Sequence, residues 1–436
     1  MTVTTMPDQP GAVAEEALYR RTLWRVLVPI AILTFINSID RMNVSFAGQL
    51  MSRDVGLTPS EFGKGVSTFF IAYLLFQYPH ALLLRRLGIR VWLLLSMTVW
   101  GIAGLMMSRV QDPQDFLVAR FVLGAAEAGF APGMTWYISQ WTPRATRARA
   151  MAIALSAVPF SLVVGGPLCG WLLGMANPLD MPEWRWMFLV SAVPNFVFAI
   201  VAALYFVDRP GQARWLDPDE GKRLEALIDS EASGSTSGLA FGTAIRDARV
   251  WLCAATWFLV MTGSYALVYW LPQIVRQLAI ADSELMIGTL SALPQAGLVS
   301  GLFLNARHSD RHGDRLWHTS AGALLAGIAL FAAVAMPIGP SVLVMLVIAG
   351  FGIGASQGVF WTVPAALGIG GGQVPIGVIA AVSMAGTAGG VVGPTMMGWL
   401  VERSGSHSPA IMILAGFLLL AALLLGATAM QQRRLR

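Results

Sequence analysis

The sequence predicts an all-α membrane protein with twelve transmembrane helices in two pseudo-symmetric six-helix bundles, and three observations lead to this fold class. First, 56% of the 436 residues are hydrophobic and only 12% are charged, whereas a soluble domain has about 25% charged residues. Second, the chain contains twelve mostly apolar stretches of about the 20 residues that span a bilayer. Third, its second half repeats motifs of its first half. These features exclude a soluble enzyme, a disordered chain and an outer-membrane barrel, whose strands would alternate apolar and polar residues.

The first six spans are separated by short polar segments or by glycine and proline. The polar N-terminal tail lacks the basic-then-apolar layout of a cleaved signal peptide, so we expect the first span to stay in the membrane. We expect an N-terminal six-helix bundle over residues 1–207. Its spans are predicted at 23–47, 62–84, 91–110, 115–140, 148–175 and 185–207.

A charged segment at 208–249 separates the two halves and includes a Ser/Gly-rich run. It is long enough for one short amphipathic helix but not for a catalytic domain. We therefore expect a cytoplasmic linker, followed by a C-terminal six-helix bundle over 250–436. The spans of this bundle are predicted at 250–276, 284–306, 316–337, 341–367, 374–400 and 408–430.

Two loops at equivalent positions in the halves carry the same motif. The loop after the second span reads Arg-x-Gly-x-Arg-x-Trp from Arg86 to Trp92, and the loop after the eighth span repeats it from Arg311 to Trp317. A Gly-Pro motif followed by Gly-Trp-Leu recurs in the fifth and eleventh spans. Parallel repeats with a substrate site between them near the midplane are typical of transporters.

The basic residues predict the orientation of the chain. Of the 29 Lys and Arg residues, 21 lie in the tails, the linker and the loops on one side, and six lie on the other side. Because loops rich in Lys and Arg stay in the cytoplasm, we expect both termini to be cytoplasmic and the protein to lie in the plasma (bacterial inner) membrane. The pI near 9.5 then reflects topology, and no nucleic-acid partner is expected. We expect a monomer in the lipid bilayer.

Few ionisable residues remain at membrane depth: Asp40 and Arg41 in the first span, and Arg120 and Glu127 in the fourth. A charge at the bilayer centre costs about 3 kcal/mol on insertion scales, so such residues face a partner or a water-filled cavity. Arg120 and Glu127 are close to two helical turns apart and project from one helix face. One interpretation is structural, with salt bridges that join the first span to the fourth, although a buried ion pair is weak evidence for stability.

The functional interpretation follows from counting charge. With both acids ionised, the four residues sum to zero and the arginines are occupied. Protonation of Asp40 and Glu127 frees Arg41 and Arg120 to bind an anion, and the guanidinium fork matches a carboxylate. This arrangement is typical of proton-coupled anion uptake. His80 is a further candidate for a titrating group, although its place near the end of the second span favours an interfacial residue.

We expect no cofactor and no metal. The glycines at 368–372 lack the Lys-Ser/Thr that follows the glycines of a P-loop, and no cluster of His, Asp and Glu shows metal-ligand spacing. A membrane enzyme is therefore disfavoured, and no signalling domain points to a sensor. Four histidines in or beside loops are expected to be solvated: His308, His312, His318 and His407.

Three segments resemble the anion:cation symporter branch of the major facilitator superfamily. They are NSIDRMNVSFAGQLMSRDVGLTPSEFG at 37–63, RFVLGAAEAGFAPG at 120–133 and FWTVPAALG at 360–368, together with the Arg-x-Gly-x-Arg loops. The similarity covers essentially the whole chain. It implies the major facilitator fold and the transport, together with protons, of organic anions such as sugar acids, tartrate or aromatic carboxylates.

The resemblance also implies roles for single residues of the first half. Asp40 and Glu127 are expected to be the proton-coupling acids. Arg41 and Arg120 are expected to serve substrate binding and coupling, with Tyr73 in the cavity. We therefore predict a proton-coupled symporter that imports an organic carboxylate by alternating access. A proton-driven exporter or antiporter of a metabolite or drug on the same fold is the alternative.

In the second half the resemblance points to Trp361 and to polar positions of the eleventh span. Many relatives carry two asparagines where this chain has Ser383 and Thr387, which weakens an assignment to polyhydroxylated sugar acids. Several aromatic residues, Tyr265 among them, are candidates to stack on an aromatic carboxylate, with helix packing as the alternative.

Overall fold

The computed structural model describes residues 18, 20–233, 246–372 and 374–435. In these residues, eleven helices are long and apolar enough to cross a membrane, so the protein is an integral membrane protein.

The first half contains η1 (Leu23–Leu27), α2 (Val28–Val55), α3 (Pro59–Ser108), α4 (Pro113–Glu127), α5 (Phe130–Ser139), α6 (Arg144–Leu155), α7 (Ala157–Gly174) and α8 (Glu183–Tyr205). Between the halves lie η2 (Pro210–Gln212) and α9 (Pro218–Ser233). The second half contains α11 (Ala248–Gln277), α12 (Glu284–His312), α13 (Arg315–Ala335), α14 (Pro340–Phe360), α15 (Val363–Ala366), η3 (Ile369–Gly372), α16 (Ile376–Ser404) and α17 (Ser408–Leu435).

The long helix α3 contains two of the predicted spans. At Gly88 the backbone leaves the helical region, with φ 73° and ψ 171°, a conformation that glycine adopts at little cost. The N–H of Ile89 donates to Asp208 Oδ1 at 2.6 Å, and a Cβ atom at position 88 would collide with this carboxylate. The twelve predicted spans are therefore present, but the loop expected at 85–90 is a bend at one residue.

Residues at the helix ends explain where several spans begin and stop. The side chains of Thr58 and Glu61 form a capping box at the start of α3, and Ser283 caps the start of α12. The α12 helix stops at Gly313, which has a left-handed φ of 66°. Such caps satisfy backbone groups that have no partner inside the helix.

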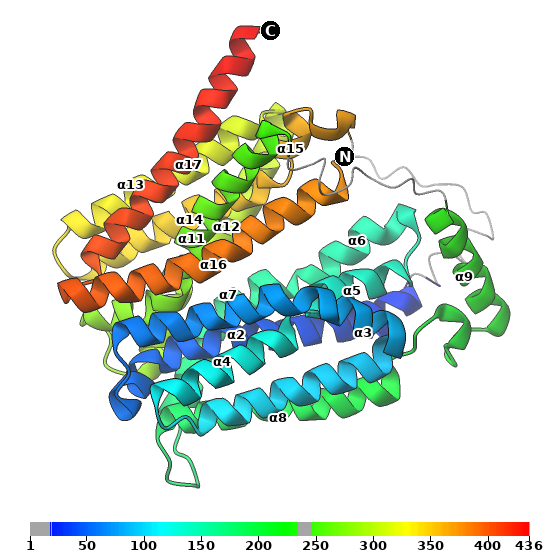
Figure 1. Cartoon of the computed structure of the whole chain (residues 1–436), viewed down its shortest axis with the longest axis horizontal. Helices are drawn as coiled ribbons and strands as arrows, with labels where there is room; N and C mark the ends of the chain where they lie inside the picture. Colours follow the sequence, from blue (N-terminus) through cyan, green and yellow to red (C-terminus); the bar gives the residue numbers. More distant parts are fainter. Residues whose placement is uncertain (1–17, 19, 234–245, 373, 436) are drawn as a thin grey trace.

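The helices of the first half lie together on one side of the molecule, and α11 to α17 lie together on the other side (Figure 1). Across the boundary α2 packs against α11, α3 against α16, and α7 against α12. Glycines allow the last two contacts: a Cβ at Gly63 would meet the Pro394 carbonyl, and one at Gly166 would meet the Gly288 carbonyl. Gly166 therefore permits the close packing of α7 against α12.

The linker contains a short helix, as expected. Glu220 of α9 forms an ion pair with Arg21 at 3.1 Å, and the Arg144 guanidinium donates to the Glu231 carbonyl at 2.6 Å. These contacts attach α9 to the first half beside the start of α6, where α9 lies at the edge of the molecule (Figure 1).

Candidate functional site

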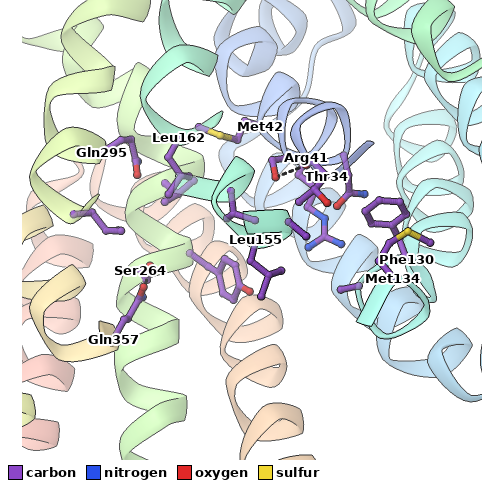
Figure 2. Close-up of a pocket in the computed structure, with 18 of the residues that line it drawn as sticks. Thr34, Arg41, Met42, Phe130, Met134, Leu155, Leu162, Ser264, Gln295 and Gln357 are labelled. Carbon is purple, nitrogen blue, oxygen red and sulfur yellow. Dashed lines mark hydrogen bonds between the residues drawn. The ribbon is translucent and has the colours of Figure 1, made fainter. Parts of the chain in front are cut away.

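A cavity of about 270 Å³ lies between the two groups of helices, lined by residues of α2, α5, α6 and α7 on one side and of α11, α12 and α14 on the other (Figure 2). Arg41 is the one charged side chain among the described residues that line it. The apolar part of the lining includes Met42, Phe130, Met134, Leu155, Val158, Leu162 and Leu298. The polar part consists of Thr34, Asn37, Ser38, Thr135, Ser264, Tyr265, Tyr269, Gln295 and Gln357.

The predicted residues Arg41 and Glu127 form a buried ion pair. Arg41 Nε donates to Glu127 Oε2 at 2.7 Å, and the Glu127 side chain is fully inaccessible while that of Arg41 is 26% exposed. Asn37 Nδ2 donates to the same oxygen at 2.9 Å. Within the described part of the chain, Arg41 Nη2 and Glu127 Oε1 have no hydrogen-bond partner. The pair therefore leaves one buried guanidinium nitrogen without a hydrogen bond, on a residue that lines the cavity.

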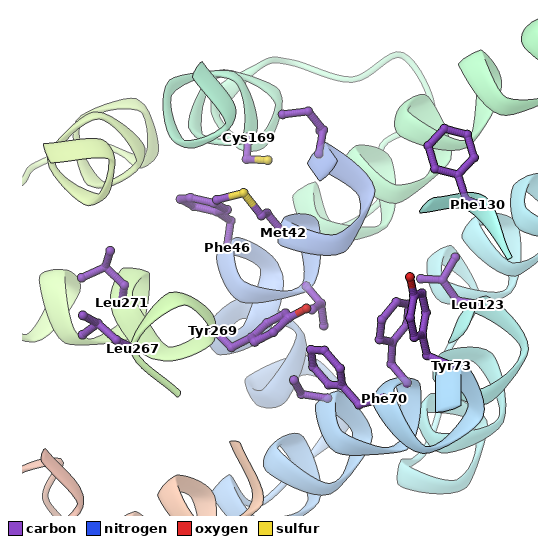
Figure 3. Close-up of a cluster of buried hydrophobic side chains, with 14 of the residues drawn as sticks. Met42, Phe46, Phe70, Tyr73, Leu123, Phe130, Cys169, Leu267, Tyr269 and Leu271 are labelled. Atoms are coloured by element: carbon purple, nitrogen blue, oxygen red, sulfur yellow. The ribbon is translucent and has the colours of Figure 1, made fainter. Parts of the chain in front are cut away.

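Two aromatic rings hold the Arg41 guanidinium in place. Its Cζ lies 4.8 Å from the centre of the Tyr73 ring and 5.4 Å from that of Phe69. The predicted residue Tyr73 thus contacts the cation directly, although it does not line the cavity itself. Figure 3 shows Tyr73 within the buried aromatic cluster that also contains Phe70 and Tyr269.

Asp40 points away from the cavity, toward α8. Asn195 Nδ2 donates to Asp40 Oδ2 at 2.7 Å, and Asn43 Nδ2 donates to Asp40 Oδ1 at 3.1 Å. The described residues include no ion pair to Asp40 within 4 Å, so it does not occupy an arginine as the charge count from the sequence assumed. It is held instead by amides between α2 and α8.

Arg120 is also absent from the cavity lining. It is 1% exposed, its Nε donates to the Gly65 carbonyl at 3.4 Å, and its Cζ lies 4.7 Å from the centre of the Phe69 ring. Phe69 is therefore contacted by both arginines. The four predicted residues form one ion pair, one amide-bound acid and one buried cation.

The predicted residues of the second half lie in different places. Tyr265 lines the cavity and packs against Phe70 at 4.6 Å between ring centres. Trp361, Ser383 and Thr387 do not line it. Trp361 is 43% exposed and lies edge-on to a neighbouring tryptophan, and the Thr387 hydroxyl donates to the Ser383 carbonyl within α16 at 3.0 Å. A substrate role for these three residues stays a prediction.

The sequence interpretation missed the polar wall that the second half contributes. Gln357 Nε2 donates to Ser264 Oγ at 3.1 Å, and Gln295 Oε1 is buried without a partner in the described part of the chain. Figure 2 shows these side chains on the wall opposite Arg41. Amides in otherwise apolar helices were the available signal, because polar residues at membrane depth are costly and tend to face a bundle interior or a cavity.

Two histidines, His80 and His407, are buried side chains with hydrogen-bond partners. His407 is 6% exposed and bonds to Gln277 Oε1 at 2.7 Å, so the expectation that it is solvated is wrong. His80 is buried: its Nδ1 accepts a bond from Trp92 Nε1 at 3.1 Å, and its Nε2 lies 2.8 Å from the Ala125 carbonyl. His80 thus joins α3 to α4.

The remaining three histidines are not separate solvated side chains. His308 and His312 are exposed and His318 is half-buried, and their ligand atoms lie within 4.8 Å of one another. The sequence analysis found no cluster of His, Asp and Glu with metal-ligand spacing, whereas the fold brings these three histidines together.

Two six-helix halves around a central cavity with a buried ion pair define a transporter class, and comparison with known proteins agrees. The model of the Major Facilitator Superfamily matches residues 30–368. A putative tartrate transporter of Agrobacterium vitis is 36% identical over 94% of this chain and 91% of the relative. A quinolone resistance transporter of Acinetobacter baumannii is 32% identical over 94% of each chain.

Among solved structures, an inward-facing bacterial homologue of the human lysosomal transporter Spinster matches with a TM-score of 0.69 and 19% identity, over 93% of this chain and 95% of that one. This likeness concerns the fold. The chain belongs to the major facilitator superfamily. It is accordingly a membrane transporter of small organic molecules and not an enzyme.

Proposed function

We propose that this transporter imports an organic monocarboxylate together with protons, by alternating access around the central cavity. One observation carries the proposal: Arg41 is bound to Glu127 through Nε at 2.7 Å, while its Nη2 has no partner among the described residues. A guanidinium binds a carboxylate most strongly through two parallel N–H donors. Half of that fork is free and the other half is occupied by a buried acid.

Protonation of Glu127 supplies the coupling. A neutral Glu127 no longer holds Arg41 by charge, so that Nε and Nη2 can both turn to a substrate carboxylate. The substrate anion then replaces the Glu127 charge beside Arg41. The cost of an unpaired buried charge therefore favours the simultaneous presence of proton and anion over the presence of either one alone.

The cavity lining supports a substrate with one carboxylate and a largely apolar body. Arg41 is its one cation among the described lining residues, and Arg120 is 1% exposed. A second carboxylate would face the neutral amides of Gln295 and Gln357 or an apolar wall, where an unpaired charge is costly. Tyr265 and Tyr269 offer rings for an aromatic acid. A cavity of about 270 Å³ suits a small molecule of this kind.

The direction of transport and the orientation rest on other observations. The 21 basic residues on the side of the tails support cytoplasmic termini in the plasma membrane, and we retain a monomer as the working unit. Export in exchange for protons is the second candidate, because the relative from Acinetobacter baumannii is named a quinolone resistance transporter.

Uptake into proteoliposomes tests the proposal. Purified protein is reconstituted, an inward proton gradient is imposed, and a panel of aromatic monocarboxylates, aliphatic monocarboxylates, tartrate and sugar acids is offered. We expect accumulation of an aromatic or apolar monocarboxylate that a protonophore abolishes. Accumulation of tartrate alone would refute a monocarboxylate substrate. Uptake that does not depend on the proton gradient would refute coupling to protons. Efflux of substrate driven by the same proton gradient would show that the protein is an exporter.

A substitution at Glu127 tests the coupling residue. Glu127→Gln imitates the protonated acid, so we expect loss of gradient-driven accumulation with retained exchange of substrate across the membrane. Glu183→Gln is the matched control, because Glu183 is exposed in the first turn of α8. Full accumulation by Glu127→Gln would rule out Glu127 as the coupling acid.

A further inference from the structure

We propose that His308, His312 and His318 form a binding site for a divalent late transition-metal ion, with Zn²⁺ as the reference ion. Three of the five histidines of the chain meet at one surface point. Their ligand nitrogens lie within 4.8 Å of one another, in the one such group of His, Cys, Asp and Glu found among the described residues. This site lies outside the transport cavity and is independent of the transported substrate.

Two helices bring the three imidazoles together. His308 and His312 are four residues apart on α12, so they lie on the same helix face. The chain then turns at Gly313, in a left-handed conformation, and His318 follows in the first turns of α13. His308 Nδ1 lies 2.6 Å from His318 Nε2, and the ring centres of His308 and His312 are 4.2 Å apart.

Backbone carbonyls already orient two of the rings as ligands. His318 Nδ1 lies 2.6 Å from the Asp314 carbonyl, and His312 Nδ1 lies 2.9 Å from the His308 carbonyl. A carbonyl can only accept, so Nδ1 of each ring carries the proton and Nε2 keeps a lone pair. Metal-binding histidines almost always donate their second nitrogen in this way, which fixes both tautomer and ring direction. The arrangement therefore has the outer-shell hydrogen bonds of a metal site as well as its ligands.

The ligand set selects the class of ion. Neutral imidazoles suit Zn²⁺, Ni²⁺ and Cu²⁺ and do not suit Mg²⁺ or Ca²⁺, which prefer oxygen ligands. Metal–nitrogen distances of about 2.0–2.1 Å require the His308–His318 contact to open slightly, by rotation of the exposed His308 ring. The exposure of His308 and His312 gives the ion an entry path and leaves water as the further ligand.

Two of the neighbouring cations are already paired with acids. The Arg315 guanidinium is bonded to Asp310 and to Ser309 Oγ at 3.1 Å. Arg433 near the end of α17 donates to Asp314 Oδ2 at 3.1 Å. A bound ion would join the end of α12 to the start of α13, next to the C-terminal helix.

Metal titration of the full-length protein tests the site. The protein is purified in detergent, its affinity tag is removed, it is treated with EDTA, and Zn²⁺ is titrated against a chromophoric chelator. We expect one equivalent of Zn²⁺ to bind and a Cu²⁺ spectrum with nitrogen hyperfine structure. Loss of an outer-shell partner alone costs roughly 10–100-fold in metal affinity, so His312→Ala should weaken binding at least tenfold, and alanine at all three histidines should abolish it.

Arg311→Ala is the matched control, since it removes a neighbouring side chain from the same turn and keeps the three imidazoles. It should bind Zn²⁺ at least as tightly as the wild-type chain. Zn²⁺ should also raise the melting temperature of the wild type and of Arg311→Ala but not that of the triple variant. The proposal is overturned if the wild type binds no Zn²⁺, or if the triple variant binds it with unchanged affinity.

Discussion

The guanidinium of Arg41 is bound to a buried acid at Nε, while its Nη2 is buried without a hydrogen-bond partner among the described residues. Its second contact is with Phe69 and Tyr73, whose rings restrict its movement. A lysine at this position would keep the positive charge against Glu127. It would lose the pair of parallel donors that suits a carboxylate. The shape of the cation is therefore as important here as its charge.

We expect Arg41→Lys to weaken substrate binding about tenfold, since a charge-assisted hydrogen bond contributes roughly 1.5–3 kcal/mol and 1.4 kcal/mol is a tenfold change. Binding is measured by the ligand-induced rise in melting temperature of purified protein. Arg53→Lys, on the exposed last turn of the same helix, is the control and should behave as wild type. An unchanged substrate affinity in Arg41→Lys would show that the Arg41 guanidinium does not bind the substrate carboxylate through two N–H donors.

His407, outside the membrane spans, predicts a pH dependence of stability. Burial lowers its pKa to about 4, from an ordinary value of about 6.5. Between these values the unfolded chain binds a proton that the folded chain does not. The stability that the neutral imidazole supports is therefore complete above pH 6.5 and is lost as the pH falls toward 4.

The loss that comes from His407 should reach about 2 kcal/mol in the free energy of unfolding at pH 5. Thermal unfolding of wild type and His407→Gln is compared at pH 7.5 and pH 5 in the presence of EDTA. We expect the wild type to lose more stability than the variant, since carboxylates titrate equally in both. An equal loss in the two proteins would mean that His407 is protonated in the folded state.

Residue-scale features differed in how far the sequence could predict them. The scarcity of charge pointed to Arg41 and Glu127, and the structure pairs them at 2.7 Å. Asp40 and Arg41 are adjacent, so their side chains point about 100° apart, and Asp40 turns to α8. The place of Gln295 and Gln357 in the cavity wall could not be predicted, because it depends on which helix faces meet in space. The histidine cluster could not be predicted either, because it forms only when the turn at Gly313 brings His318 back to α12.

At the scale of helices, the contact between α7 and α12 depends on the absence of a side chain. A Cβ at Gly166 would meet the carbonyl oxygen of Gly288, a backbone atom that cannot rotate away. Gly174, on the same helix, has open space around the position of a Cβ. These two glycines therefore form a natural comparison.

We expect Gly166→Val to prevent the close approach of α7 and α12 and to reduce transport about 10-fold or more, because overpacking costs about 1–3 kcal/mol. Gly174→Val should transport as wild type. Both variants are compared in the proteoliposome uptake assay, with expression and monodispersity as checks on folding. Wild-type uptake by Gly166→Val would show that this contact is not part of the transport cycle.

The helices themselves were predictable from apolar runs, since a bilayer requires about 20 such residues. The bend in α3 was not, because one glycine in a positive-φ conformation replaces what the three arginines within residues 85–90 suggested as a loop. The interruption of the fourth span between α4 and α5, at Ala128 and Gly129, also left no clear signal in the sequence. The outer limits of the two bundles, at 207 and 250, stay a prediction.

At the scale of the whole molecule, hydrogen bonds join the two halves between the first turns of α3 and the C-terminal half of α16. The N–H of Ser60 donates to Glu402 Oε2 at 2.9 Å, and Ser67 Oγ donates to the Val391 carbonyl at 2.6 Å. Thr395 Oγ1 donates to Ser67 Oγ at 2.7 Å. These bonds close one end of the boundary between α3 and α16 and must break if the halves rock apart at that end.

A reversible cross-link across this contact tests whether its opening is required for transport. Cysteines replace Ser60 and Glu402, and a short bis-methanethiosulfonate joins them; the native Cys169 and Cys253 are buried and give little background reaction. We expect cross-linking to abolish uptake and reduction to restore it, because alternating access needs both ends of the boundary to open in turn. A cysteine pair at Asp54 and Arg185 is the control, because both residues lie in the first half, with Arg185 Nε 3.6 Å from Asp54 Oδ2. Cross-linking of this pair should leave uptake largely intact. If the Ser60–Glu402 cross-link formed fully and uptake continued, the two halves would not separate at this end, and transport by rocking of the halves would be excluded.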